Sequence, residues 1–308
     1  MLKVSNLSKA FGHVIAVDRI SFDISAGEIF GFLGPNGAGK TTTINMICGL
    51  LKPDNGEIEL DGQNFTPDRA NLRRKLGVVP QEIALYEELN AYENLKFWGQ
   101  LYGMKGKDLR NRINELLNLS GLAGRIKDRV KTYSGGMKRR LNMMAGLIHN
   151  PALLLLDEPT VGIDPQARHN ILDSVKEIAV QGTTILYTTH YLDEAEDLCD
   201  RLAIIDQGRI LAMGTESEIK STVGENSIIR ITGNIKREVI DDLVKSHSNL
   251  HVESIKDREV LFSIPSKDGT GRVIESIIQS EINVENMQIK EPSLDSVFIK
   301  LTGKELRD

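Results

Sequence analysis

Residues 34–42 read GPNGAGKTT and match the phosphate-binding pattern G-x-x-x-x-G-K-[S/T]. The apolar stretch EIFGFL at 28–33 precedes this loop, and the helical stretch TTTINMICGL at 41–50 follows it. Glycines in such a loop let the backbone turn its N–H groups onto a phosphate, and the helix N-terminus adds a partial positive charge. This strand, loop and helix predict a nucleotide-binding α/β fold.

Two side chains of the loop have predicted roles. Lys40 would reach the β- and γ-phosphates, and Thr41 would place its hydroxyl on Mg²⁺. The alternative is a glycine-rich turn without a ligand, which leaves the strand before the loop and the helix after it unexplained. The predicted nucleotide-binding residues of the loop are Gly34, Pro35, Asn36, Gly37, Ala38, Gly39, Lys40, Thr41 and Thr42.

The composition is ordinary for a folded protein of about two domains, with 40% hydrophobic and 26% charged residues among 308. The 38 basic and 43 acidic residues are mixed along the chain, so no surface for nucleic acid is predicted. Cys48 and Cys199 lack the spacing of a disulfide framework or a zinc site. The longest apolar run is ALLLL at 152–156, so the chain is not expected to enter a membrane by itself.

Strand and helix patterns divide the chain into two predicted domains, 1–215 and 216–308. The first alternates strands and helices, as an α/β core with a mostly parallel sheet does, and a helical insertion interrupts it at about 84–150. Beyond residue 215 the order of patterns is β-α-β-β-α-β plus a terminal helix, which is the ferredoxin-like plan. We therefore expect a small α+β accessory domain at the end of the chain.

Two helix starts are marked in the first domain. Asn90 and Glu93 have the spacing of a capping box. Asp164 and Pro165 supply an N-cap residue and a proline in the first helical position. These signals predict helices that begin at residues 91 and 165.

Polar residues stand at the carboxyl ends of three predicted buried strands, the edge at which open α/β sheets bind ligands. Asp157 and Glu158 follow the run ALLLL, His190 follows TTILYTT, and Gln81 follows KLGVVP. In isolation Asp157 and Glu158 could cap a turn, and His190 could be a structural hydrogen-bonding residue. Beside a phosphate loop, we expect Asp157 to be a direct or outer-shell partner of Mg²⁺ and Glu158 to polarise the attacking water. His190 would hold the γ-phosphate, and Gln81 would hold Mg²⁺ or the water.

A second anion-binding signal, YSGGMKRRL, lies at 133–141. Ser-Gly-Gly before a helix can simply cap it, or can present a hydroxyl and backbone amides to a phosphate. The helix is expected to turn its apolar face inward and the three basic residues at 138–140 elsewhere. The alternative to simple capping is that Ser134, Gly135 and Gly136 bind the γ-phosphate of a nucleotide held by a different chain.

Taken together, the order of GPNGAGKTT, Gln81, YSGGM, LLLLDEP, VGIDP and His190 resembles the ATP-binding cassette (ABC) ATPases over residues 1–215. The resemblance implies a RecA-like P-loop NTPase core with an antiparallel β-subdomain and a helical subdomain. It also implies that two cassettes hold two ATP molecules head to tail, in a homodimer or with a related ATPase. Phe11 would then stack on adenine, and residues 161–164 would join the two sites.

The ending EPSLDSVFIKLTGKELRD at 291–308 is similar to that of ATPase subunits of ABC-2 type exporters. This implies a subunit that hydrolyses MgATP at the cytoplasmic face of the membrane and drives a separate transmembrane permease. The permease's coupling helix would meet residues 82–103. The signature departs from the common one, because Tyr133 and Met137 replace the usual Leu and Gln. Met137 cannot make an amide's hydrogen bonds, but the backbone amides and Ser134 remain.

Two other classes of protein share part of this pattern. A soluble cassette ATPase of translation or DNA maintenance would share the nucleotide site, but this chain has one cassette, no sustained heptad repeat and no basic surface. A GTPase or small-molecule kinase would leave YSGGM unexplained, and the guanine-reading Asn-Lys-x-Asp is missing. An ATPase subunit of an exporter is the leading expectation.

Overall fold

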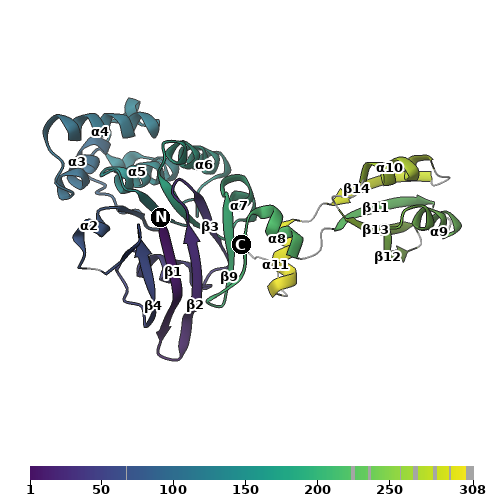
Figure 1. Ribbon diagram of the computed structural model, residues 1–308. Helices are drawn as coiled ribbons and strands as arrows, with labels where there is room; N and C mark the ends of the chain where they lie inside the picture. Colours follow the sequence, from purple (N-terminus) through teal and green to yellow (C-terminus); the bar gives the residue numbers. More distant parts are fainter. Residues whose placement is uncertain are drawn as a thin grey trace. The chain divides into compact units, whose positions relative to one another are not determined.

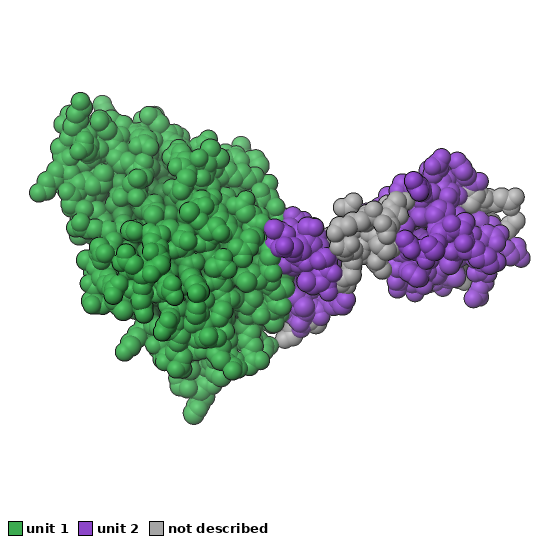
Figure 2. Space-filling view, in the orientation of Figure 1, with its two compact units in different colours: residues 1–214, 306–308 green, residues 215–305 purple. Residues whose placement is uncertain are grey.

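The computed structural model describes residues 1–66, 68–222, 226–234, 237–256, 258–265, 270–279, 283–290 and 293–302. The chain forms two compact units, one of residues 1–214 and a second that begins at Thr215 (Figure 2). Each unit has its own core and is described by itself.

A six-stranded sheet in the order β10-β9-β3-β8-β7-β6 forms the centre of the first unit (Figure 1). Only β10 pairs antiparallel; the other neighbours are parallel. All five residues of β7 are buried, as expected for an apolar run covered on both faces. The strands are β3 (Ile29–Leu33), β6 (Leu76–Val79), β7 (Leu153–Asp157), β8 (Thr184–Thr189), β9 (Arg201–Asp206) and β10 (Arg209–Gly214).

A smaller antiparallel sheet in the order β2-β1-β4-β5 packs on the central sheet. Its strands are β1 (Leu2–Phe11), β2 (Val14–Ile24), β4 (Asn55–Leu60) and β5 (Gln63–Asn64). Phe22 of β2 stacks on Phe30 of β3 with ring centroids 5.5 Å apart. One buried cluster therefore joins the two sheets and α1 (Lys40–Ile47).

The helices of the helical insertion gather at one end of the first unit (Figure 1). They bury a second cluster against the opposite face of the central sheet. The predicted capping box is confirmed, because Asn90 and Glu93 exchange hydrogen bonds at the start of α3. Asp164 caps α6 and Pro165 stands in its first turn, also as predicted. Besides α1, the helices of this unit are α2 (Ala70–Arg73), α3 (Ala91–Leu101), α4 (Gly106–Leu119), α5 (Gly135–Leu147), α6 (Pro165–Val180) and α7 (Leu192–Leu198). Two 3₁₀ turns lie at Ala123–Arg125 and Val130–Thr132.

The second unit holds a four-stranded antiparallel sheet in the order β12-β13-β11-β14, with an apolar core around Ile229, Phe262 and Ile277. The order β-α-β-β-α-β confirms the ferredoxin-like prediction. Helix α8 (Glu216–Thr222) was not predicted from the sequence. The other elements are β11 (Asn226–Asn234), α9 (Arg237–Ser246), β12 (His251–Lys256), β13 (Glu259–Pro265), α10 (Thr270–Gln279), β14 (Asn283–Lys290) and α11 (Leu294–Thr302).

Candidate functional site

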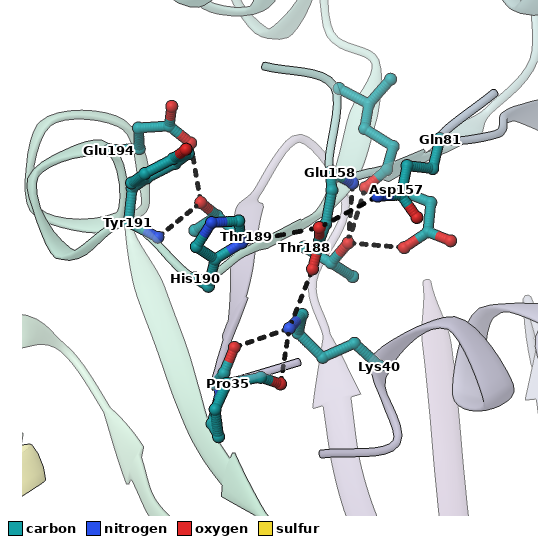
Figure 3. A network of polar contacts seen from close by, with 12 residues as sticks. Pro35, Lys40, Gln81, Asp157, Glu158, Thr188, Thr189, His190, Tyr191 and Glu194 are labelled. Carbon is teal, nitrogen blue, oxygen red and sulfur yellow. Dashed lines mark hydrogen bonds and ion pairs between the residues drawn. The ribbon is translucent and has the colours of Figure 1, made fainter. Parts of the chain in front are cut away.

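The order of the central sheet brings the predicted site residues to one edge. Strands β3, β8, β7 and β6 lie side by side and point the same way, so the segments after them meet. Figure 3 shows Lys40, Gln81, Glu158 and His190 turned toward one another there. A cavity of about 370 Å³ opens beside them, lined by Ala16, Asn36, Gly37, Gly39, Lys40, Thr41, Thr42, Gln81 and Glu158.

The backbone of the phosphate loop needs its glycines for two different reasons. A Cβ on Gly34 would lie 2.2 Å from the carbonyl oxygen of Ile205, so the close packing of the loop on β9 excludes a side chain. Gly39 has φ +106°, and a Cβ there would lie 2.4 Å from the carbonyl oxygen of Ala16. The loop therefore keeps a shape in which backbone N–H groups can face an anion.

Lys40 and Glu158 form a buried ion pair at the centre of the site. The Nζ of Lys40 lies 2.9 Å from Oε1 of Glu158, and both residues are about 95% buried, with relative exposures of 4% and 5%. Nζ also donates to the carbonyls of Gly34 at 2.6 Å and Pro35 at 3.0 Å. The same ammonium group is the natural partner for a phosphate, because a buried cation requires a counter-charge.

The second oxygen of Glu158 has two further polar neighbours. Gln81 donates through Nε2 at 3.5 Å, and Nδ1 of His190 lies 3.5 Å away. Glu158 has φ +44°, in the left-handed region that non-glycine residues rarely adopt. Its N–H donates to the hydroxyl oxygen of Thr188 at 3.0 Å, which helps to hold this conformation. A carboxylate fixed in this way at a cavity can accept a proton from a water molecule.

Asp157 lies next to Glu158 in a different environment. Thr188 donates to its Oδ1 at 2.8 Å. Burial raises the pKa of Asp157, and hydrogen bonds from Thr188 and Thr41 partly offset that rise. A buried carboxylate beside a threonine hydroxyl is the hard oxygen donor set that Mg²⁺ accepts, so Asp157 and Thr41 fit this ion.

Glu194, a buried carboxylate that is not predicted from the sequence, supports the loop that carries His190. Glu194 is 1% exposed and accepts from the hydroxyl of Tyr187 at 2.9 Å. It also accepts from the hydroxyl of Thr189 at 2.7 Å (Figure 3). The hydroxyl of Thr189 in turn accepts from the N–H of Tyr191 at 2.9 Å. Glu194 thus fixes the backbone on both sides of His190. The only sequence signal was an acidic residue in the first turn of α7, which usually indicates a favourable helix end and no more.

The Ser-Gly-Gly segment takes no part in this cluster. Ser134 caps α5 by accepting from the N–H of Met137 at 3.3 Å, and both Ser134 and Gly135 are exposed. Gly136 is buried against α6, where a Cβ would lie 2.6 Å from that of Ala167. Within the part of the chain that the structure describes, no hydrogen bond joins these three residues to the phosphate loop.

Phe11 lies at the end of β1 and is 51% exposed. The ammonium group of Lys9 lies 5.8 Å from the centroid of its ring. No contact joins Phe11 to the cluster around Glu158 among the described residues, although Ala16 on the neighbouring strand β2 lines the cavity. The ring is thus available for a flat partner near the mouth of the site.

Comparison with known proteins decides the family. Residues 17–161 match the family model described as ABC transporter, and residues 214–302 match the C-terminal domain of DrrA1-3-like ATP-binding proteins. The linearmycin resistance ATP-binding protein LnrL of Bacillus subtilis (strain 168) is 45% identical over 313 residues, which cover 100% of both chains. The chain belongs to the ABC transporter ATP-binding proteins. This chain, called the ABC subunit from here on, is therefore an ATPase. Its relatives do not favour a role in translation or DNA maintenance.

Further relatives agree with this assignment. The daunorubicin/doxorubicin resistance ATP-binding protein DrrA of Streptomyces peucetius is 38% identical to the ABC subunit, covering 98% of this chain and 92% of DrrA. A solved ATP-binding subunit of an ABC transporter has a TM-score of 0.66 at 33% identity. The match covers 73% of this chain and 93% of the solved chain. A dimeric cassette bound to ADP and Pi in a post-hydrolysis state has a TM-score of 0.62 at 29% identity, covering 70% and 98%. Cassettes of this family are dimeric and act with membrane permease components.

Proposed function

We propose that the ABC subunit powers an exporter by closing on a second ATPase subunit around two ATP molecules. The observation that carries this proposal is the separation of two phosphate-binding devices in one chain. The phosphate loop and Glu158 line one cavity, whereas Ser134 and Gly135 are exposed at a helix start and do not contact it. A head-to-tail dimer would bring the exposed device of one subunit to the cavity of the other.

The cavity residues would divide the reaction between them. Lys40 would bind the β- and γ-phosphates, Glu158 would accept a proton from the attacking water, and His190 would hold the γ-phosphate. Thr41, Gln81 and Asp157 would hold Mg²⁺. When bound, this ion would neutralise charge on the phosphate oxygens. Phe11 would stack on the adenine ring.

A groove near the helical insertion supports docking of the permease. It has a volume of about 380 Å³ and is lined mainly by apolar side chains, among them Leu50, Trp98 and Tyr102. Leu50 is 78% exposed, and the nearby ring pair Tyr86 and Phe97 is also partly exposed. We expect a coupling helix of the permease to cover residues 82–103 at this groove, because such an apolar patch marks a protein interface.

The place of the subunit in the cell follows from this assembly. No helix among the described residues is long and apolar enough to cross a membrane. We therefore propose attachment to the cytoplasmic face through the permease, as a homodimer or with a related ATPase. LnrL and DrrA are named for resistance to linearmycin and to daunorubicin, which supports export of a compound of that kind. Residues 216–308 would serve as an accessory domain.

Mixing two inactive variants tests the composite site. Lys40→Ala removes the phosphate loop's cation, and Ser134→Ala removes the hydroxyl that would be lent to the partner. In a mixed head-to-tail dimer both lesions fall in one site and the other site is intact. Phosphate release should then recover to about a quarter of the wild-type rate, since half of the dimers are mixed and each has one intact site. A mixture no more active than either variant alone would count against the head-to-tail model.

A further inference from the structure

Arg139 is a buried cation on the Ser-Gly-Gly helix whose position the sequence did not suggest. The sequence pattern predicts that residues 138–140 lie away from the apolar face of the helix, yet Arg139 is only 5% exposed. Burial lowers the pKa of its guanidinium group. It pairs with no carboxylate in the described part of the chain, and its partners are two main-chain carbonyls. A buried charge held only by carbonyls is costly, so its position calls for a specific role.

The two carbonyls belong to the segment that carries Gln81. The Nη1 of Arg139 donates to the carbonyl oxygen of Gln81 at 2.6 Å and to that of Pro80 at 3.2 Å. The side chain of Gln81 makes a longer contact, 3.5 Å, with Glu158. The backbone of Gln81 is therefore attached more closely to α5 than its side chain is to the catalytic carboxylate.

Two buried asparagines extend this attachment along the same segment. Asn142 of α5 accepts from the N–H of Ala84 at 3.0 Å. Asn94 of α3 accepts from the N–H of Tyr86 at 2.8 Å and donates to its carbonyl at 3.0 Å. Both asparagines are at most 3% exposed. Residues 80–86 are thus fastened at three points to helices of the helical insertion.

We infer that Arg139 is a positioning residue for Gln81, which it ties to the same helix whose start carries Ser134. Ser134 caps α5, and Arg139 lies five residues further along it, about 7.5 Å along the axis. A helix of this length moves as a unit, so the approach of Ser134 to a partner's nucleotide and the placement of Gln81 beside Glu158 become one movement. This inference rests on the proposed roles of Gln81 and Ser134.

Variants at Arg139 and its neighbour Arg140 test this assignment. Arg139→Met removes both hydrogen bonds, and Arg139→Lys keeps the charge and an N–H donor group. Arg140→Met is the matched control, because Arg140 is on the same helix but donates to the carbonyl of Ser120 at 2.8 Å, away from Gln81. For each variant, kcat, the Kd of a fluorescent ATP analogue, the Mg²⁺ concentration at half-maximal rate and Tm would be measured.

Arg139→Met should lower kcat about 10–100-fold and raise the half-maximal Mg²⁺ concentration, because Gln81 is misplaced. The Kd of the ATP analogue should stay within about twofold, since Lys40 and the loop are untouched. Arg139→Lys should recover part of kcat, and Arg140→Met should behave like the wild type. Equal losses in Arg139→Met and Arg140→Met would show a general weakening of α5 and overturn the inference. Should Arg139→Met fail to fold, Arg139→Gln, which removes the charge and is too short to make both hydrogen bonds, takes its place: an unchanged half-maximal Mg²⁺ concentration in that variant overturns the inference.

A double variant separates the inference from the proposed function. If Arg139 acts through Gln81, then Gln81→Ala with Arg139→Met should be no slower than Gln81→Ala alone. Multiplied losses would mean that Arg139 acts elsewhere. If Gln81→Ala itself hydrolysed ATP normally, the proposed role of Gln81 would fall, and the inference with it. If Gln81→Ala were slow and Arg139→Met normal, the inference alone would fall.

Discussion

Replacing Glu158 with Gln tests the buried ion pair and the reaction in one variant. Gln has nearly the same shape but carries no charge, so Lys40 loses its counter-charge at 2.9 Å. Removing one partner of a buried pair costs about 3–5 kcal/mol. Here Lys40 keeps two carbonyl acceptors, at 2.6 and 3.0 Å, and the Gln amide oxygen remains an acceptor. We therefore expect a smaller loss, of about 1–2 kcal/mol.

This loss can be read as a melting temperature. For a unit of about 200 residues, 1 kcal/mol corresponds to about 2–4 °C, so the variant should melt about 2–8 °C below the wild type without nucleotide. With MgATP the order should reverse, because bound ATP persists in the variant and stabilises the folded dimer. Phosphate release should fall about 10²–10⁴-fold, the usual contribution of a general base.

Differential scanning fluorimetry with and without MgATP, a phosphate-release assay and gel filtration would measure these quantities. Glu115→Gln is the control, since Glu115 pairs with Arg112 on the surface, is 55% exposed and should change stability little. Phosphate release within about threefold of the wild-type rate, which is close to the smallest difference such an assay resolves, would show that Glu158 is not the general base. An unchanged melting temperature without nucleotide would show that Lys40 does not depend on Glu158.

Three further perturbations follow from the same geometry. Lys40→Ala should abolish ATP binding or turnover in an equilibrium binding and phosphate-release assay; near-normal hydrolysis would contradict the role of the phosphate loop. Gly136→Ala should lower Tm, because the new Cβ would lie 2.6 Å from that of Ala167. Adding Ala167→Gly should restore most of this loss in a thermal melt, and a double variant less stable than Gly136→Ala would refute the steric explanation. Removing residues 216–308 should leave the Kd for ATP unchanged, and loss of binding would place part of the nucleotide site in the second unit.

Local patterns were enough to predict much of the fold. The capping box at Asn90 and the Asp164-Pro165 helix start depend on neighbours three residues apart or fewer, so the sequence displays them directly. The alternating strands and helices after residue 215 likewise follow from periodicity. The missed helix α8 also had a local signal, because Thr215 and Glu218 exchange capping-box hydrogen bonds. That helix could have been found by the rule applied to Asn90.

The parts that were not predictable depend on distant contacts. Arg139 sits in a helical pattern that places basic side chains outside, and only the fold brings the carbonyl of Gln81 over it. Glu194 becomes a support of the His190 loop because Tyr187 and Thr189 of the adjoining strand point toward it. Hydrophobic periodicity contains no information on which polar side chain receives such a partner.

The left-handed backbone of Glu158 bears on how this protein can be engineered. A side chain at φ +44° costs about 1 kcal/mol or more, whereas Gly or Asn adopts that region at little cost. Gly or Asn at position 158 would relieve this strain, but it would also leave Lys40 without its counter-charge at 2.9 Å, which costs more than the strain relieved. A stabilising library for this family of chains should hold that codon fixed, or screen every stabilised clone for turnover.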